Sequence, residues 1–254
     1  MMEIKNILLT GGTGKLGKAI LSSGLFSSLL APKREIFDIT KPDTVRKFLE
    51  SNPVDAVVHC AALARMGECH QNPVKAIETN IIGTGNLVNE IISQEKKLQK
   101  KIRFVHISTD GVYQGTRGHY SEEDASIPYN RYGWSKLGAE CAVRLLNNFC
   151  IIRTSFFDPE DIKFETSAFD AYSSKITIHC LVRAVAKIID SPFIGIVNIG
   201  SERKSDYERY KEFKPSVKPC KLSDILKTVP FPMAKDASMD VSLWKKIEEG
   251  LKEK

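Results

Sequence analysis

The 254-residue sequence has no long apolar run, no low-complexity tract and no internal repeat. Its N-terminal apolar stretch, NILLTGG, is too short for a signal peptide or a membrane span. The six cysteines, at positions 60, 69, 141, 150, 180 and 220, show no CxxC spacing, which argues against a disulfide framework. We therefore expect a globular cytoplasmic protein with reduced thiols and no membrane partner.

A strong charge imbalance is also missing. The formal net charge is +6, and the basic residues are spread along the chain without interleaved aromatics, so we expect no nucleic-acid partner. His59-Cys60 and Cys69-His70 offer four potential metal ligands. Because His59 and Cys60 end an apolar run typical of a strand, we expect no metal site there.

Strand-like and helix-like patterns alternate along the chain. Apolar runs typical of buried strands lie at 4–9, 56–59, 102–108, 150–155 and 193–200, and helical patterns at 42–51, 73–97, 130–147, 179–189 and 241–252. This alternation predicts an α/β fold with a doubly wound, Rossmann-like parallel sheet. We assign 1–155 to a dinucleotide-binding domain, to which 177–200 return. The charged, proline-broken segments 156–176 and 201–254 are expected to form a small, loop-rich C-terminal substrate lobe.

A glycine-rich segment, TGGTGKLG at 10–17, follows the first of these strands. Gly11, Gly14 and Gly17 stand between a strand and a helix. Glycines there allow a tight turn that brings backbone N–H groups close to a pyrophosphate at the helix N-terminus. Because the triplet opens an alternating pattern, it predicts dinucleotide binding.

The motifs together resemble the extended branch of the short-chain dehydrogenase/reductase superfamily, and within it the dTDP-4-dehydrorhamnose reductase-like group. The resemblance covers the first 155 residues, in the segments TGGTGKLG (10–17), FDITKPDTV (37–45), CAAL (60–63), NIIGTGNLV (80–88), ISTDGVYQG (107–115) and YGWSKLGAE (132–140). The last hundred residues match only loosely. The resemblance implies an NAD(P)-dependent reductase of a nucleotide-linked 4-keto-6-deoxy sugar, as used in dTDP-rhamnose and polysaccharide biosynthesis.

The resemblance selects one of three similar tyrosine pairs. Tyr132, Tyr207 and Tyr210 are each followed by a lysine four residues later, a spacing that puts both side chains on one helix face. Only Tyr132 follows a strand that ends in the hydroxyl residues which complete the site in the family. We therefore expect Tyr132 and Lys136 to be catalytic, and Tyr207 and Tyr210 to lie at the surface.

In the implied mechanism, hydride from the nicotinamide reaches a ketone carbon while Tyr132 donates a proton to its oxygen. The Lys136 ammonium would lower the pKa of the phenol and bind the nicotinamide ribose. Thr109 would hydrogen-bond the carbonyl oxygen, with Ser108 as the alternative.

The residue after Thr109-Asp110 separates related reactions. Nucleotide-sugar 4,6-dehydratases carry a glutamate there, because eliminating water requires a second acid/base pair, whereas this chain has Gly111. Dehydration is therefore disfavoured, and reduction or epimerisation through a 4-keto sugar remains. We expect Asp110 and Tyr113 to bind substrate, although Asp110 could instead cap a turn.

The cofactor is expected to be NADP, with NAD as the alternative. After the second strand the chain offers Lys33 and Arg34, with no acid before Glu35, and basic residues accommodate a 2′-phosphate whereas an acid binds the free ribose. The predicted cofactor-binding residues, most of them implied by the resemblance, are Gly11, Thr13, Gly14, Lys15, Leu16, Gly17, Lys33, Arg34, Asp38, Ile39, Cys60, Ala61, Ala62, Leu63, Asn80, Tyr132 and Lys136.

Two other functions stay open at this point. One is a nucleotide-sugar epimerase that keeps its cofactor bound. The other is a cofactor-binding regulatory protein, because related chains include the regulatory subunit of methionine adenosyltransferase. Some reductases of the group form metal-bridged dimers through an acid two positions past the last loop glycine; this chain has Ala19 there. We expect no metal, and a homodimer remains open.

Overall fold

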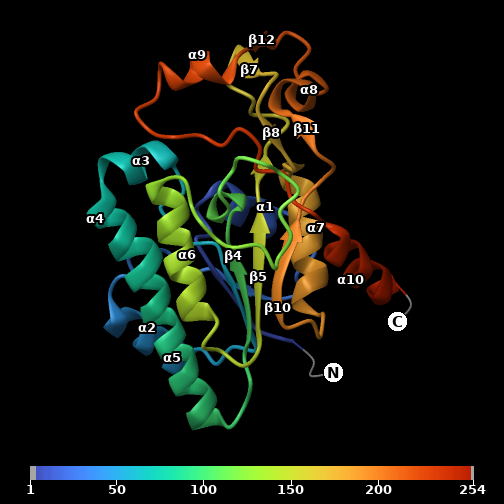
Figure 1. Ribbon diagram of the computed structural model, residues 1–254. Helices are drawn as coiled ribbons and strands as arrows, with labels where there is room; N and C mark the ends of the chain where they lie inside the picture. The colour runs from blue at the N-terminus through green and yellow to red at the C-terminus, as the bar shows by residue number, and fades with distance from the viewer. Residues whose placement is uncertain (1–3, 253–254) are drawn as a thin grey trace.

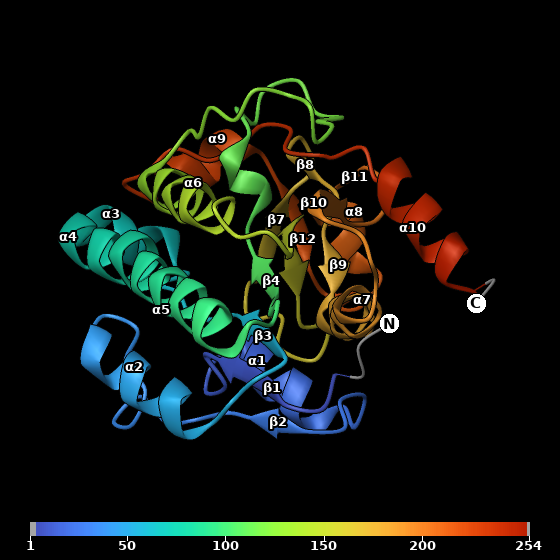
Figure 2. The same cartoon turned by 90° about the horizontal axis from the view of Figure 1, so that it is seen from below.

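The computed structural model describes residues 4–252 and centres on a six-stranded parallel sheet (Figure 1, Figure 2). The strand order is β10-β5-β4-β3-β1-β2. Successive strands proceed outward from β1 in both directions, so the switch point lies between β1 and β3, where ligands of such sheets bind. The strands are β1 (Ile7–Thr10), β2 (Leu29–Leu30), β3 (Ala56–His59), β4 (Arg103–Ile107), β5 (Phe149–Thr154) and β10 (Gly195–Ile199).

Helices cover both faces of the sheet. One layer contains α2 (Pro42–Ser51), α5 (Gly83–Leu98) and α6 (Arg131–Val143), and the other α1 (Lys15–Ser22) and α7 (Ile178–Ile189). Consecutive strand residues point to opposite faces, so Phe104 and Ile151 pack in the first layer, and Val105 and Ile152 in the second. Burial on both faces explains why these strands are apolar without alternation. Within residues 4–252, none of the helices has the length and apolarity that a membrane crossing requires.

The long helix expected over 73–97 is present but irregular. After the short helix α3 (Met66–Gln71), α4 (Pro73–Ala76) leads into a π-helical segment (Ile77–Ile82) and then into α5. Such π turns inside α-helices are frequent at functional sites. Here the π turn carries Thr79, which faces the cleft described below, and the buried Asn80.

A small lobe sits beyond the carboxyl ends of the strands, at the top of Figure 1. Its two-stranded sheets pair β6 (Phe156–Phe157) with β9 (Ile176–Thr177), β7 (Thr166–Ala168) with β12 (Lys218–Cys220), and β8 (Tyr172–Ser173) with β11 (Lys204–Ser205), and its helices are α8 (Asp206–Lys211) and α9 (Leu222–Leu226). The last helix, α10 (Ser242–Lys252), leaves this lobe, since Trp244 is buried in the core formed by the sheet and α7. The predicted lobe segments, 156–176 and 201–254, therefore include one helix, α10, that packs on the core and does not belong to the lobe.

Of the two lobe tyrosines that were expected at the surface, Tyr210 is buried. Tyr210 is only 7% exposed and packs edge to face against Phe157 and Phe164. The prediction that it lies at the surface is wrong, because aromatic residues from the segment after β5 cover it. Tyr207 lies on the outer side, where its hydroxyl accepts a hydrogen bond from Lys211 at 2.8 Å.

Helix α6 begins in direct backbone contact with the loop after β4. The Asn130 side chain caps it by accepting a hydrogen bond from the Gly133 N–H at 2.9 Å. A Cβ at Gly133 would lie 2.1 Å from the Gly111 carbonyl oxygen, so only glycine allows this approach. The contact fixes how close the first turn of α6 comes to the end of β4.

We expect Gly133→Ala to destabilise the protein by about 1–3 kcal/mol, because the added methyl forces the helix and the loop apart. Gly85→Ala is the matched control: that glycine is inside α5 with open space at the Cβ position, and the change should stabilise by about 0.5–1 kcal/mol. Urea unfolding of both variants measures the difference. Equal midpoints would show that the backbone contact is not a constraint.

Candidate functional site

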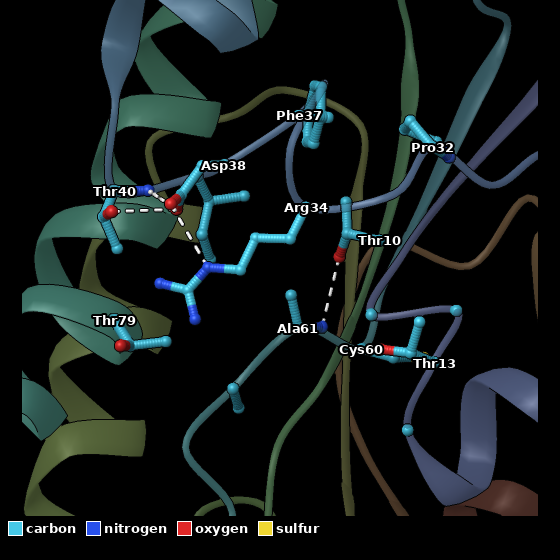
Figure 3. A pocket seen from close by; sticks show the side chains of 15 residues that line it. Thr10, Thr13, Pro32, Arg34, Phe37, Asp38, Thr40, Cys60, Ala61 and Thr79 are labelled. Carbon is cyan, nitrogen blue, oxygen red and sulfur yellow. Dashed lines mark hydrogen bonds and ion pairs between the residues drawn. The ribbon is translucent and has the colours of Figure 1, made fainter.

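A cleft of about 240 Å³ opens at the carboxyl ends of β1 and β3 (Figure 3). The predicted cofactor residues that line it are Gly11, Thr13, Gly14, Arg34, Asp38, Ile39, Cys60, Ala61 and Ala62. Sequence reasoning missed the other lining residues, Thr10, Gly12, Pro32, Phe37, Thr40 and Thr79. All six missed residues directly adjoin predicted ones in the sequence, and that adjacency was the available signal.

The glycine loop forms a tight cradle at one end of this cleft. Gly14 N–H donates to the Gly11 carbonyl at 2.9 Å, and Gly11 has φ +72°, a left-handed conformation that favours glycine. A Cβ at Gly17 would lie 2.2 Å from the Gly11 oxygen, so α1 begins directly against the loop. Leu16 and Gly17 are therefore buried below the cleft and do not line it.

Buried side chains hold the floor of the cleft. The Ala61 N–H donates to Thr10 Oγ1 at 3.1 Å, and the same hydroxyl bonds His59 Nδ1 at 2.7 Å. The other ring nitrogen of His59 bonds the Thr84 hydroxyl at 3.0 Å. Burial, together with the charge of Lys136, lowers the pKa of His59 to about 3. This neutral histidine ties β1 and β3 to α5.

Arg34 reaches into the cleft from its far end, as Figure 3 shows. Its Nε lies 3.2 Å from Asp38 Oδ2, and its side chain remains 66% exposed. Burial raises the pKa of Asp38, but hydrogen bonds from Thr40 and Arg34 outweigh it and leave the pKa below its usual value. Lys33 is exposed and does not line the cleft. Lys15 also points elsewhere, toward Asp161 at 2.5 Å.

Asn80 connects the cleft to the Tyr132 helix. Its side chain accepts from the Leu63 N–H at 2.7 Å and donates to the Leu63 carbonyl at 3.1 Å. It also donates to Ser135 Oγ at 2.8 Å, and that hydroxyl donates to the Tyr132 carbonyl at 2.8 Å. Asn80 thus links the backbone of Leu63 to the Tyr132 helix through Ser135, and neither Leu63 nor Asn80 lines the cleft.

The loop after β4 brings Thr109 beside Tyr132. Thr109 Oγ1 accepts from the Gly111 N–H at 3.1 Å and caps a 3-10 turn (Asp110–Val112). Burial raises the pKa of the Tyr132 phenol, and the Asp110 charge raises it further, whereas a hydrogen bond with Thr109 acts in the opposite direction. The phenol therefore holds its proton tightly in the free protein.

Lys136 is buried one helical turn beyond Tyr132. It is 3% exposed, and its Nζ lies 3.2 Å from His106 Nε2. Burial lowers the pKa of Lys136 to about 8, although the nearby Glu140 charge acts to raise it. The ammonium therefore lies beside a histidine, and the lowering of the Tyr132 pKa by Lys136 stays a prediction.

The two predicted substrate residues lie in different surroundings. Asp110 is 8% exposed and accepts a hydrogen bond from Thr109 Oγ1 at 3.1 Å. Burial raises its pKa to about 6, and Lys175 in the lobe acts to lower it. Tyr113 is fully buried and donates its hydroxyl to Asn198 at 2.8 Å. Tyr113 has no surface that a substrate could touch, so the structure argues against its predicted function.

A buried ion pair underlies these groups. Arg153 Nη2 lies 2.8 Å from Glu140 Oε2, with the two side chains 1% and 0% exposed. Ser108 donates its hydroxyl to the same Glu140 carboxylate, which explains why Ser108 faces away from Tyr132 while Thr109 faces it. The Arg153 guanidinium also stacks 4.9 Å from the Tyr113 ring centroid. The pair links α6 to β4 and β5.

A parallel sheet with a glycine cradle at its switch point, and a Thr-Tyr-Lys set beside it, defines a Rossmann-like protein of the short-chain dehydrogenase/reductase class. Residues 5–166 match the model of the RmlD substrate binding domain family. The chain therefore belongs to this family, and the resemblance inferred from its motifs is confirmed.

Curated relatives and solved structures agree with this assignment. Methionine adenosyltransferase 2 subunit beta of Rattus norvegicus is 31% identical over 183 residues, which cover 68% of this chain and 53% of that protein. The dTDP-4-keto-6-deoxy-D-glucose reductase of Streptomyces niveus is 33% identical over 154 residues, with coverages of 59% and 51%. The chain thus spans about half the length of these curated relatives.

Solved structures also match nearly the whole chain. The dTDP-4-dehydrorhamnose reductase from Bacillus anthracis, in complex with NADP, has a TM-score of 0.83 at 21% identity and covers 99% of this chain and 98% of its own. A hypothetical dTDP-4-dehydrorhamnose reductase from Sulfolobus tokodaii has a TM-score of 0.80 at 27% identity, with coverages of 95% and 94%. These likenesses confirm the predicted Rossmann-like fold.

Glu140→Gln is expected to destabilise the protein by about 3–5 kcal/mol, because it leaves the Arg153 charge buried without a compensating anion. A matched control is Glu248→Gln, which breaks the half-exposed pair with Lys187 and should cost less than about 1 kcal/mol. Chemical unfolding with a fixed m-value measures both. Similar losses in the two variants would contradict the proposed importance of the buried pair.

Proposed function

We propose that the protein is an NADP-dependent reductase of a nucleotide-linked 4-keto-6-deoxy sugar. The observation that carries this proposal is the meeting of Thr109 and Tyr132 at the carboxyl edge of the sheet, with Lys136 buried one turn away. NADP would lie in the cleft at β1 and β3, where the close approach of Gly17 to Gly11 sets the N-terminus of α1 directly behind the glycine loop, and a helix N-terminus favours a pyrophosphate. The NADP named for the Bacillus anthracis structure supports this choice.

In this proposal the bound nicotinamide supplies hydride, and the chain's own residues handle the proton. Tyr132 donates its proton to the substrate carbonyl oxygen, and Thr109 donates a hydrogen bond to that oxygen as negative charge develops on it. Lys136, charged below about pH 8, favours the phenolate that remains and binds a cofactor hydroxyl in place of its bond to His106. Asp110 contacts the substrate.

The substrate would be held by the lobe formed by 156–176 and 201–241, which covers the carboxyl ends of the strands. We also propose a homodimer, supported by the exposed apolar residues Val74 on α4, Ile77 and Ile82 on the π-helical segment that follows it, and Trp134 on α6. The proposed location is the cytoplasm, where nicotinamide cofactors and nucleotide sugars are available.

The second candidate is a cofactor-binding regulatory subunit. It is favoured by the 31% identity to proteins named methionine adenosyltransferase 2 subunit beta. A regulatory protein needs the cleft but has no need of a proton donor. Turnover therefore separates the two candidates, whereas cofactor binding does not.

The first test is NADPH consumption with a panel of nucleotide-linked 4-keto-6-deoxyhexoses. Wild-type protein should oxidise NADPH with at least one of them, and Tyr132→Phe should lower kcat by about 10²-fold or more, because the proton donor is lost. Tyr207→Phe, at the exposed Tyr207-Lys211 pair, is the control and should retain full activity. NADPH binding without turnover of any sugar would exclude the reductase and favour the regulatory subunit.

Cofactor choice can be tested at the two adjacent basic residues. Arg34→Ala should weaken NADPH binding by about tenfold, the size of one charge-assisted hydrogen bond, and leave NADH binding unchanged. Lys33→Ala removes the same charge from outside the cleft and should change neither. Fluorescence titration gives the four dissociation constants. An equal effect of the two variants would mean that only general electrostatics act on the 2′-phosphate.

A further inference from the structure

Position 111 lacks a side chain although the backbone does not demand glycine. Gly111 is not among the residues with positive φ. A Cβ there would meet Thr109 Oγ1 at 3.4 Å and the Tyr129 hydroxyl at 3.8 Å, both ordinary contacts. This differs from Gly133, where no Cβ fits. Backbone geometry therefore does not explain the missing side chain at 111, and the neighbouring phenol of Tyr129 offers an explanation.

Tyr129 is held so that its hydroxyl stands over Gly111. Gly115 has φ +73°, and a Cβ there would lie 3.0 Å from Cδ1 and 3.1 Å from Cε1 of the Tyr129 ring. The ring thus lies flush against the Gly115 backbone, on the loop that follows Tyr113. This arrangement directs the hydroxyl toward the space that a side chain at 111 would occupy.

The Tyr129 hydroxyl has no hydrogen-bond partner among residues 4–252, although its neighbours are polar. Burial raises the pKa of the phenol, the charges of Asp110, Tyr132 and Asp206 raise it further, and Lys175 acts to lower it. The Cβ position of Gly111 lies within 4 Å of both this hydroxyl and Thr109 Oγ1, and Thr109 is hydrogen-bonded to Tyr132, so the phenol lies beside the Thr109-Tyr132 pair. Lys175 belongs to the lobe, where both oxygens of Asp206 hold its Nζ at 2.8 and 2.9 Å.

We propose that Tyr129 is a substrate-contacting residue whose phenol takes the place of the missing side chain at 111. Its hydroxyl would donate a hydrogen bond to a sugar hydroxyl or ring oxygen next to the carbon that faces Tyr132. The ligand class is a hexose carried on a nucleoside diphosphate, so this inference rests on the proposed function and adds a specificity-determining residue to it. The hydroxyl is free for such a bond because the protein satisfies it nowhere else.

The test is calorimetric binding of dTDP-, UDP-, GDP- and CDP-linked hexoses to NADP-saturated protein, with the sugar-free nucleoside diphosphates as controls. Tyr129→Phe keeps the ring against Gly115 and removes only the hydroxyl. It should weaken binding of the preferred nucleotide sugar by about 3- to 10-fold, the size of one neutral hydrogen bond, and leave the free nucleotide and NADPH unchanged.

A rescue variant tells a hydrogen bond from a packing effect. Gly111→Ser in the Tyr129→Phe background puts a hydroxyl back beside the vacated position, and it should recover part of the lost affinity for the sugar. Unchanged affinity in Tyr129→Phe overturns the proposal, as does an equal loss for the free nucleotide. Failure of wild-type protein to bind any nucleotide sugar overturns it as well.

Turnover distinguishes this proposal from the function on which it rests. If wild-type protein binds a nucleotide sugar but does not reduce any keto sugar, the proposed reductase fails while the Tyr129 contact is still decided by the binding ratio. If wild-type protein reduces a keto sugar, KM should rise in Tyr129→Phe with kcat nearly constant. A fall in kcat alone contradicts a binding contact.

Discussion

The backbone contact between Gly133 and Gly111 is the constraint on which the site depends. It brings the start of α6 against the end of β4, with no side chain between them. Tyr132 directly precedes Gly133, and Thr109 lies two residues before Gly111, so the contact between the two glycines also brings Thr109 and Tyr132 together. The same device operates at the cofactor cleft, where Gly17 brings α1 against Gly11. Both halves of the site are therefore positioned by close backbone approach.

Buried charged residues lie next to the site that these backbone contacts form. Lys136 sits among groups that burial keeps neutral, His59 and His106, and its charge lowers the pKa of both. The anion that offsets it is Glu140, which is shared with Arg153. Because breaking a buried pair costs far more than breaking an exposed one, Glu140 supports the fold through its pair with Arg153, and its charge also acts to raise the pKa of Lys136.

The sequence predicted those features that depend on local pattern. Alternating strands and helices, the glycine loop between the first strand and helix, and the helix beginning near Asn130 are encoded by neighbouring residues, and the structure has them. What failed depends on distant contacts: Tyr210 is buried by aromatic residues from another segment, and Tyr113 is turned into the core by Asn198. Periodicity carries no information about such partners, nor about the π turn that carries Asn80.

The direction of each side chain explains why only one of the two predicted basic residues, Lys33 and Arg34, lines the cleft. Lys33 and Arg34 are adjacent, so they point in different directions, and only Arg34 enters the cleft. The sequence shows that two basic residues are adjacent, whereas the backbone turn at 33–37 determines which of them points into the cleft. The same argument applies to Ser108 and Thr109 at the end of β4. Ser108 faces Glu140 in the core and Thr109 faces Tyr132, because successive residues of an extended chain alternate between its two sides.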